Sequence, residues 1–282
     1  MFFAQLTNEL WKLFGKKRTY IGFGAFVLAQ AAMLLIFKNT RWEHNFERML
    51  EGNGYLASEY ISALTVALIM LFPQAVLLMP LYVALVGGDL VAKEAEDGTL
   101  RMILSRPISR LRLLCVKWIG GMIFSTVLVL SLGAIALIAA RIIFPWKGMF
   151  VYGQLQSGGP MFALLPAATG MKLYVISNLL MVANAITLIS IAFMFSSFNM
   201  KPAAATILAL SYLFVNMVMQ RIPFLEQYQN WFVTHHFECW FLVFQSPTPW
   251  SQILQSEITL TAISATAFII GALGFQMRDI KS

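Results

Sequence analysis

The sequence carries little charge for its length. Only 12% of its 282 residues are charged, whereas 59% are hydrophobic and the mean hydropathy is +0.73. A soluble globular domain carries about 25% charged residues, so the composition excludes an ordinary soluble fold. We therefore expect an integral membrane protein. The formal net charge is +7, and the positive-inside rule accounts for this excess better than nucleic-acid binding does.

Cysteines and catalytic motifs are also scarce. The only two cysteines, Cys115 and Cys239, are expected on opposite sides of the membrane, so they cannot pair within one chain. The sequence contains no GxxxxGK[ST] phosphate-binding loop and no GxSxG nucleophile motif. We therefore expect no ATPase or hydrolase site in this chain, and no metal or cofactor of its own.

Six apolar runs are each long enough for a membrane-spanning helix. The hydrocarbon core is about 30 Å thick and a helix rises about 1.5 Å per residue, so about 20 residues cross it. The predicted spans are residues 20–37, 61–86, 118–140, 173–198, 203–219 and 258–275. They contain several amides but no Asp, Glu, Lys or Arg, which argues against a proton-driven carrier. The amides are better interpreted as contacts between helices than as a substrate site. We treat residues 1–282 as one transmembrane domain.

The distribution of cations predicts the orientation. With these spans, thirteen Lys and Arg residues fall on one side of the membrane and seven on the other. The richer side is expected to be cytoplasmic, which places both termini inside. We expect a multi-pass protein of the plasma membrane, which is the inner membrane in a bacterium.

The segment before the first span has helical periodicity. Phe3, Leu6, Leu10 and Leu13 share one face, and polar residues including Glu9 share the other. This pattern predicts an amphipathic helix on the inner membrane surface. The alternative is a simple cytoplasmic extension of the first span. Cleavage as a signal peptide is disfavoured, because the apolar run continues well beyond the nearest cleavage-like site.

Two outer connections are too long for simple turns: residues 141–172 and 220–257. The second contains both aromatic and polar residues, which suits an interfacial or re-entrant helical hairpin with Trp231 and Trp240 at headgroup depth. Within it, the cluster His235–Cys239 has metal-like spacing but no further ligand in its pattern. We interpret this cluster as polar interfacial residues.

Between the second and third spans lies an unusually charged segment, residues 87–117, with ten charged side chains. Gly98 is expected to end one helix, with Thr99 capping the next. Pro107 should stop that second helix, and Ser109 should cap the helix of the third span. The result is a helix–turn–helix elbow whose acidic cluster, residues 94–97, is expected to point toward water. We define the elbow as residues 90–110.

The residues of this segment carry a resemblance. Glu94-x-Glu96-x-Gly98-Thr99, followed by Pro107-Ile108-Ser109-Arg110 and then Lys117, resembles the signature of type-2 ATP-binding-cassette (ABC) exporter permeases. In that family the segment lies between the second and third of six spans, as it does here. The resemblance implies that the elbow is a coupling helix. The residues that it assigns to contact with an ATPase are Glu94, Glu96, Asp97, Gly98, Thr99, Arg101, Pro107 and Arg110.

The resemblance also implies the partners. It predicts a permease subunit that pairs with a second permease subunit, each docking a separate ATPase that binds ATP and Mg²⁺. Export is implied, but the sequence does not select a substrate. Two alternatives stay open: a polytopic membrane enzyme or assembly factor, and a membrane subunit that relays ATPase motion without transporting anything.

Overall fold

The chain is seen in a computed structural model that describes residues 2–105, 108–155 and 159–277. Six helical segments are long and apolar enough to cross a membrane. They are α2 (Lys17–Asn39), the composite segment Ala63–Glu96, α8 (Arg110–Ile143), α9 (Ala167–Ser197), α10 (Pro202–Gln220) and α13 (Trp250–Gln276). The predicted all-α membrane fold with six spans is therefore confirmed. Several helices extend beyond the apolar runs, because helical backbone continues into their polar flanks.

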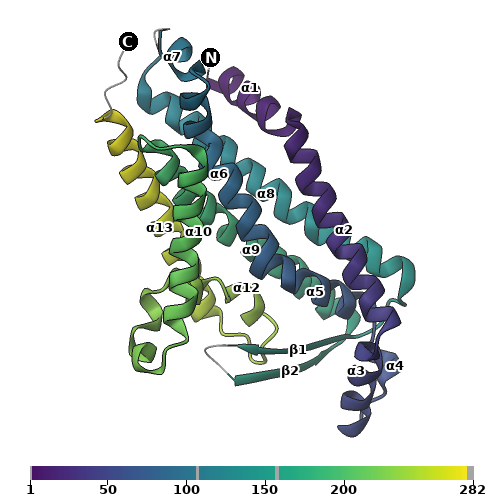
Figure 1. The fold of residues 1–282 in the computed structure, drawn as a ribbon. Helices are drawn as coiled ribbons and strands as arrows, with labels where there is room; N and C mark the ends of the chain where they lie inside the picture. The colour runs from purple at the N-terminus through teal and green to yellow at the C-terminus, as the bar shows by residue number, and fades with distance from the viewer. Residues whose placement is uncertain (1, 106–107, 156–158, 278–282) are drawn as a thin grey trace.

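The helices define two ends of the molecule (Figure 1). The elbow end carries α1 (Phe2–Gly15), α7 (Thr99–Leu104) and the last turns of α13. The hairpin end carries α3 (Arg41–Gly52), α4 (Ala57–Tyr60) and two short strands. At the centre, α9 packs against α6, α8, α10 and α13 and is the most buried of the spans. The described ends of the chain lie at the elbow end, as an even number of spans requires.

The second span is not one regular helix. It consists of α5 (Ala63–Pro73), the π-helix η1 (Gln74–Leu78) and α6 (Met79–Glu96). Pro73 lies inside the helical segment and has no N–H to donate, which favours a local change of helical pitch. The buried amide of Gln30 on α2 donates to Gln74 Oε1 at 3.1 Å and to the Leu132 carbonyl of α8 at 2.9 Å. This amide therefore joins three spans, as expected for a helix–helix contact.

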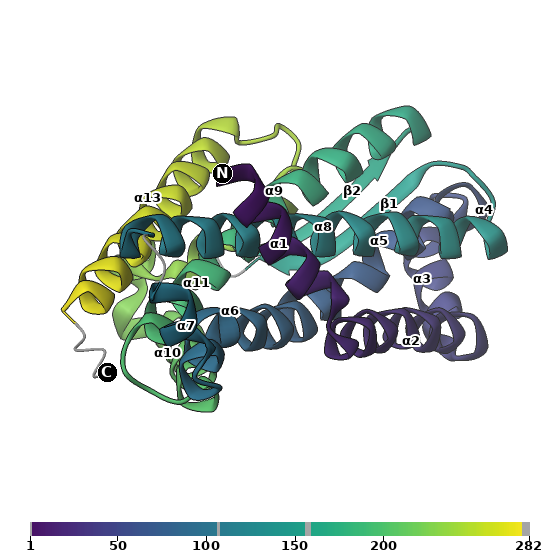
Figure 2. The ribbon, with the colours of Figure 1, turned by 90° about the horizontal axis from the view of Figure 1, so that it is seen from above.

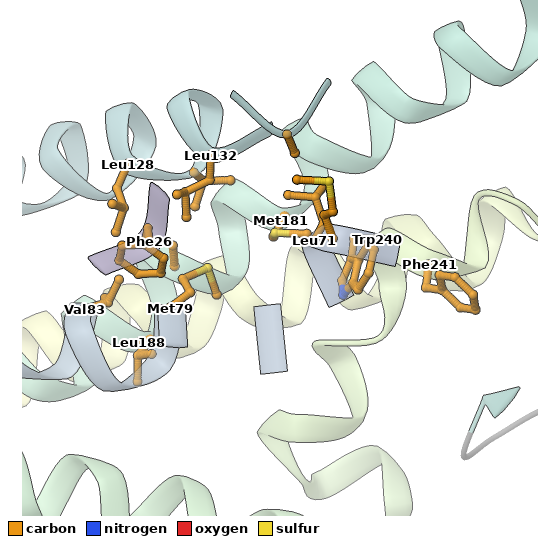
Figure 3. Packing of buried hydrophobic residues seen from close by; sticks show 14 of the residues in the cluster. Phe26, Leu71, Met79, Val83, Leu128, Leu132, Met181, Leu188, Trp240 and Phe241 are labelled. Atoms are coloured by element: carbon orange, nitrogen blue, oxygen red, sulfur yellow. The ribbon is translucent and has the colours of Figure 1, made fainter. Parts of the chain in front are cut away.

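Apolar side chains fill the spaces between these spans. Phe26 of α2 is 3% exposed and packs between α8 and α6 (Figure 3). Small residues allow closer contact elsewhere. A Cβ atom on Gly88 would collide with Thr206, so only glycine lets α6 approach α10 at this point. Ser196 of α9 donates to the Gly88 carbonyl at 2.7 Å and accepts from two backbone N–H groups of α6. The half of α6 nearer the elbow is thereby fixed to α9.

The first outer connection contains strands that the sequence analysis did not predict. β1 (Met149–Leu155) pairs antiparallel with β2 (Gly159–Leu165), and Met149 lies opposite Leu165. The backbone N–H of Phe150 donates to Thr65 Oγ1 at 2.8 Å, which ties the hairpin to the start of the second span. The hairpin closes the bottom of the bundle in the view of Figure 1.

The second outer connection forms short helices: the 3-10 helix η2 (Pro223–Trp231), α11 (Val233–His236) and α12 (Cys239–Leu242). Trp231 is 83% exposed, which agrees with a place at headgroup depth. Trp240 is only 5% exposed, and its ring lies 6.0 Å from that of Phe72. Trp240 is therefore not an exposed interfacial side chain, and its depth in the membrane stays a prediction. It packs inside the protein beside Phe241 (Figure 3).

Candidate functional site: the elbow and its buried ion cluster

The turn of the elbow forms at a glycine. α6 ends at Glu96, and Gly98 has a φ of +73°, in the left-handed region that favours glycine. α7 begins directly afterwards at Thr99. The Thr99 hydroxyl donates to the Glu94 carbonyl at 3.2 Å and so satisfies a carbonyl group at the end of α6; its role as the cap of α7 stays a prediction. Gly98 plays the predicted role of helix terminator.

The other expected features of the elbow lie on either side of a gap in the described residues. α7 ends at Leu104, and Pro107 lies outside the described residues. Ser109 accepts a hydrogen bond from the Arg112 N–H at 3.3 Å and caps α8, as predicted. Arg101 lies on α7. Arg110 Nη1 donates to the Gln276 carbonyl at 3.2 Å, so this residue connects the start of α8 to the end of α13.

Glu94 does not point toward water. Its side chain is 16% exposed, and Oε1 lies 2.8 Å from the Nζ atom of Lys117 and 3.1 Å from that of Lys12. Lys117 is 1% exposed and also contacts Glu9 Oε1 at 2.9 Å. We call Glu9, Lys12, Glu94 and Lys117 the buried ion cluster. The acidic side chain expected on the surface is thus the centre of an internal network that joins α1, α6 and α8.

The orientation of α1 explains how this cluster forms. The segment is helical, as predicted, and Figure 2 shows it lying across α8. Its inward face includes Leu13 and Glu9, each at most 7% exposed, whereas Phe3 and Trp11 are 80% and 74% exposed. Gly120 makes the contact possible, because a Cβ atom there would lie 3.3 Å from Glu9 Cγ. The exposed aromatic residues suit a membrane interface.

The charges of the cluster balance, with Lys117 at its buried centre and Lys12, 50% exposed, at its edge. It contains two carboxylates and two ammonium groups, which is the arrangement in which buried charges are tolerated. Burial lowers the pKa of Lys12, but the carboxylates of Glu94 and Glu9 outweigh this effect and hold the pKa above its ordinary value. The first span joins the same end of α6 through an ion pair between Arg18 and Asp89. Three segments of the chain therefore hold the part of α6 where the elbow begins.

The family of the chain follows from comparison with known proteins. Residues 15–273 match the ABC-2 family transporter proteins. The chain belongs to this family. No curated protein matches it. The match includes the elbow and most of each of the first and last spans, so the chain is the permease of an ABC transporter system.

The exposed part of the permease elbow is smaller than the sequence suggested. Glu96 and Asp97 are 43% and 50% exposed, and both lie near Lys93 Nζ, at 2.8 Å and 3.2 Å. These three side chains are the solvent-facing charges at the end of α6. Exposed pairs of this kind contribute little to stability, so the two carboxylates are available to a partner at little cost.

At the hairpin end, residues of the polar cluster His235–Cys239 form hydrogen bonds within the permease itself. His236 is 4% exposed, and its ring nitrogens lie 3.1 Å from the Ser256 hydroxyl and 3.1 Å from the Asn230 carbonyl. Cys239 donates to Glu257 Oε1 at 3.4 Å. Among the described residues, no group of three or more His, Cys, Asp or Glu side chains could hold a metal ion. The geometry therefore favours polar contacts between the outer connection and α13.

No local pattern in the sequence indicates the buried ion cluster. Helical periodicity grouped Glu9 with the polar face of α1, and Lys117 stands at the border of an apolar run. Pairing between α1 and α8 depends on how the helices pack.

Proposed function

We propose that this permease is the membrane subunit of an exporter and is driven by a separate ABC ATPase that docks on the elbow. The elbow end is then the cytoplasmic side, and two permease subunits act with two ATPases that hold ATP and Mg²⁺. The buried ion cluster is the observation that supports this proposal most strongly. A segment anchored to three helices transmits force to the spans, whereas a loosely attached loop would only bend.

The roles of the elbow residues follow from their surroundings. Glu96 and Asp97 are exposed and face the partner, together with the turn at Gly98 and Thr99; Arg101, in the following helix α7, is assigned to the same contact. Glu94 acts from inside, because its carboxylate is occupied by Lys117 and Lys12. It is a positioning residue for the elbow. The partner of the exposed carboxylates is expected to be a basic or amide-lined groove on the ATPase.

Co-purification tests the docking surface. The variant Glu96→Lys with Asp97→Lys should weaken binding of the ATPase by about a hundredfold or more, because charge-assisted hydrogen bonds contribute about 1.5–3 kcal/mol each. The matched control is Glu47→Lys with Glu51→Lys, which reverses two exposed acids on α3 at the opposite end. Both variants should insert normally. Retention of the ATPase at the wild-type level by the elbow variant would exclude this docking surface.

A second measurement tests whether ATP hydrolysis belongs to a separate subunit. The purified permease without a partner should show no ATP turnover, because its sequence has no phosphate-binding loop. Turnover by the chain alone that disappears when its own residues are changed would contradict the proposed function.

A further inference from the structure

The chain passes from α1 to α2 through three consecutive cations, Lys16, Lys17 and Arg18, and all three residues are exposed. Lys16 has extended backbone, and α2 begins at the next residue. We call these three residues the helix junction. In Figure 1, α1 slopes from the elbow end toward α2, so the junction lies below α7 in that view, at the start of the first span. It is a compact basic surface beside the membrane-spanning bundle.

Exposed aromatic and apolar side chains lie on both sides of the helix junction in the chain. Trp11 on α1 is exposed, and so are Tyr20 and Ile21 in the first turns of α2. Trp and Tyr are enriched at the headgroup level of a bilayer, and the apolar run of α2 continues from Ile21 toward the hydrocarbon. The ammonium groups of Lys16 and Lys17 are therefore expected at the level of the lipid headgroups.

The protein neutralises only part of the charge at this place. The buried ion cluster is balanced in itself, and Arg18 pairs with Asp89 of α6. Within the part of the chain that the structure describes, Lys16 and Lys17 form no ion pair with a carboxylate. Two positive charges of the helix junction are thus left for an anion from outside the chain.

The electrostatic surroundings of Lys16 agree with this excess of positive charge. Partial burial in the helix junction lowers the pKa of Lys16, and the positive charges of Arg18 and Lys117 also lower it. The carboxylates of Asp89 and Glu9 act in the opposite direction but do not outweigh these effects. An anion beside Lys16 would stabilise the charged form of its side chain.

The opposite end of α2 shows that exposed cations alone do not create such an excess. Lys38 and Arg41 are exposed there. The surrounding segment, residues 38–52, contains three Lys or Arg residues and three Glu residues, so its charges cancel. Clusters of Lys and Arg beside a span attract anionic lipids. The helix junction has this unbalanced character, whereas the outer end of α2 does not.

We infer that the helix junction binds the phosphate of an anionic phospholipid, such as phosphatidylglycerol, through the ammonium groups of Lys16 and Lys17. The Trp11 ring lies in the headgroup region, and the acyl chains lie along the exposed side of α2 beyond Ile21. A soluble anion would gain the charge contact without the apolar one. The bound lipid stabilises the connection between α1 and α2 beside Arg18. Placement in the inner leaflet rests on the proposed function, whereas the binding site itself does not.

Native mass spectrometry of the full chain, purified in detergent and titrated with phosphatidylglycerol, tests the site. Phosphatidylglycerol should bind about tenfold more tightly than phosphatidylcholine with the same acyl chains, because the zwitterionic headgroup carries no net charge. Equal affinity for the two lipids would overturn the inference. Glycerol phosphate has similar headgroup chemistry without acyl chains and should not displace the lipid at equal concentration. Displacement would assign the site to a soluble phosphate instead of a lipid.

Three double variants locate the contact. Lys16→Gln with Lys17→Gln should weaken phosphatidylglycerol binding about tenfold or more and leave phosphatidylcholine binding unchanged. The matched control, Lys38→Gln with Arg41→Gln, removes two exposed cations from the other end of the same helix and should bind phosphatidylglycerol like the wild type. Equal weakening in both would overturn a site at the helix junction. Lys16→Arg with Lys17→Arg keeps the charge and should retain binding; loss in this variant would contradict recognition by charge.

Thermal unfolding gives an independent readout and shows that each variant is folded. Phosphatidylglycerol should raise the melting temperature of the wild type and of the control, because a ligand that binds the folded state stabilises it. It should have little effect on Lys16→Gln with Lys17→Gln. An equal rise in that variant would place the stabilising lipid elsewhere on the protein.

The outcomes separate this inference from the proposed function. Absence of lipid selectivity in a permease that still co-purifies with its ATPase would overturn this inference alone. Selective lipid binding by a permease that co-purifies with no ATPase would overturn the proposed function alone. If Lys16→Gln with Lys17→Gln loses the ATPase but binds phosphatidylglycerol normally, the helix junction is a protein contact and the inference is wrong.

Discussion

Lys117 Nζ on α8 lies 2.8 Å from Glu94 Oε1 on α6, and the lysine side chain is 1% exposed. The contact joins the end of the second span to the start of the third, directly beside the elbow. Glu9 of α1 contacts the same ammonium group at 2.9 Å. The elbow and the N-terminal helix are therefore held by one buried cation, and several consequences can be measured.

Removal of this cation should be strongly destabilising. Lys117→Met is expected to cost about 3–5 kcal/mol, because it leaves the Glu9 and Glu94 carboxylates buried without their main partner. Lys93→Met removes an exposed lysine from the same elbow and should leave stability unchanged within error. Unfolding in detergent measures both. Adding Glu9→Gln and Glu94→Gln to Lys117→Met should restore part of the loss; a further loss of stability would mean that charge burial is not the cause.

The left-handed turn gives a second prediction. Gly98→Val should impair ATP hydrolysis that is stimulated through the permease, because a β-branched residue costs about 1–2 kcal/mol at this backbone conformation. Gly54 is the matched control: its φ is +82°, it also has open space around its Cα, and it lies at the hairpin end. Gly54→Val should cost similar stability with normal stimulation. Equal loss of stimulation in both variants would assign the effect to stability alone.

Orientation is tested by cysteine labelling. In a chain whose native cysteines are replaced, Lys147→Cys should react with a membrane-impermeant reagent added to intact cells, and Lys93→Cys should not. Both positions are exposed, at opposite ends of the structure, so accessibility in the folded chain is matched. Reaction at position 93 alone would place the elbow outside and would rule out the proposed docking of a cytoplasmic ATPase.

The outer connection should be sensitive to acid. Burial, together with the neighbouring His236 ring at 5.5 Å, holds the pKa of His235 below its ordinary value. The folded state thus takes up a proton less readily than the unfolded state does. The contribution of the neutral ring is present above the unfolded value of about 6.5 and is lost as the pH falls through the folded pKa. Melting temperatures measured from about pH 7.5 to pH 5 should fall less for His235→Gln than for the wild type. Parallel curves for the two proteins would contradict this assignment.

The features of the fold that were predictable from the sequence depend on residues that are close together in the chain. The six spans follow from apolar length, the turn at Gly98 from backbone freedom, and the cap of α8 from Ser109. The position of the elbow between the second and third spans follows from the same local patterns. Each of these features is decided within a few residues, where composition and periodicity carry the information.

Only the tertiary structure decided what each surface faces. Periodicity gave α1 a polar face, but packing against Gly120 turned Glu9 inward to meet Lys117. Glu94 is buried in the same network, and Trp240 packs against Phe72 inside the protein and is not exposed at its surface. The β1–β2 hairpin pairs neighbouring strands, but the hydrogen bond that ties it to Thr65 links segments distant in the chain. An amphipathic pattern predicts which face of a helix is apolar and which is polar. The segment that each face contacts depends on close packing over the whole molecule.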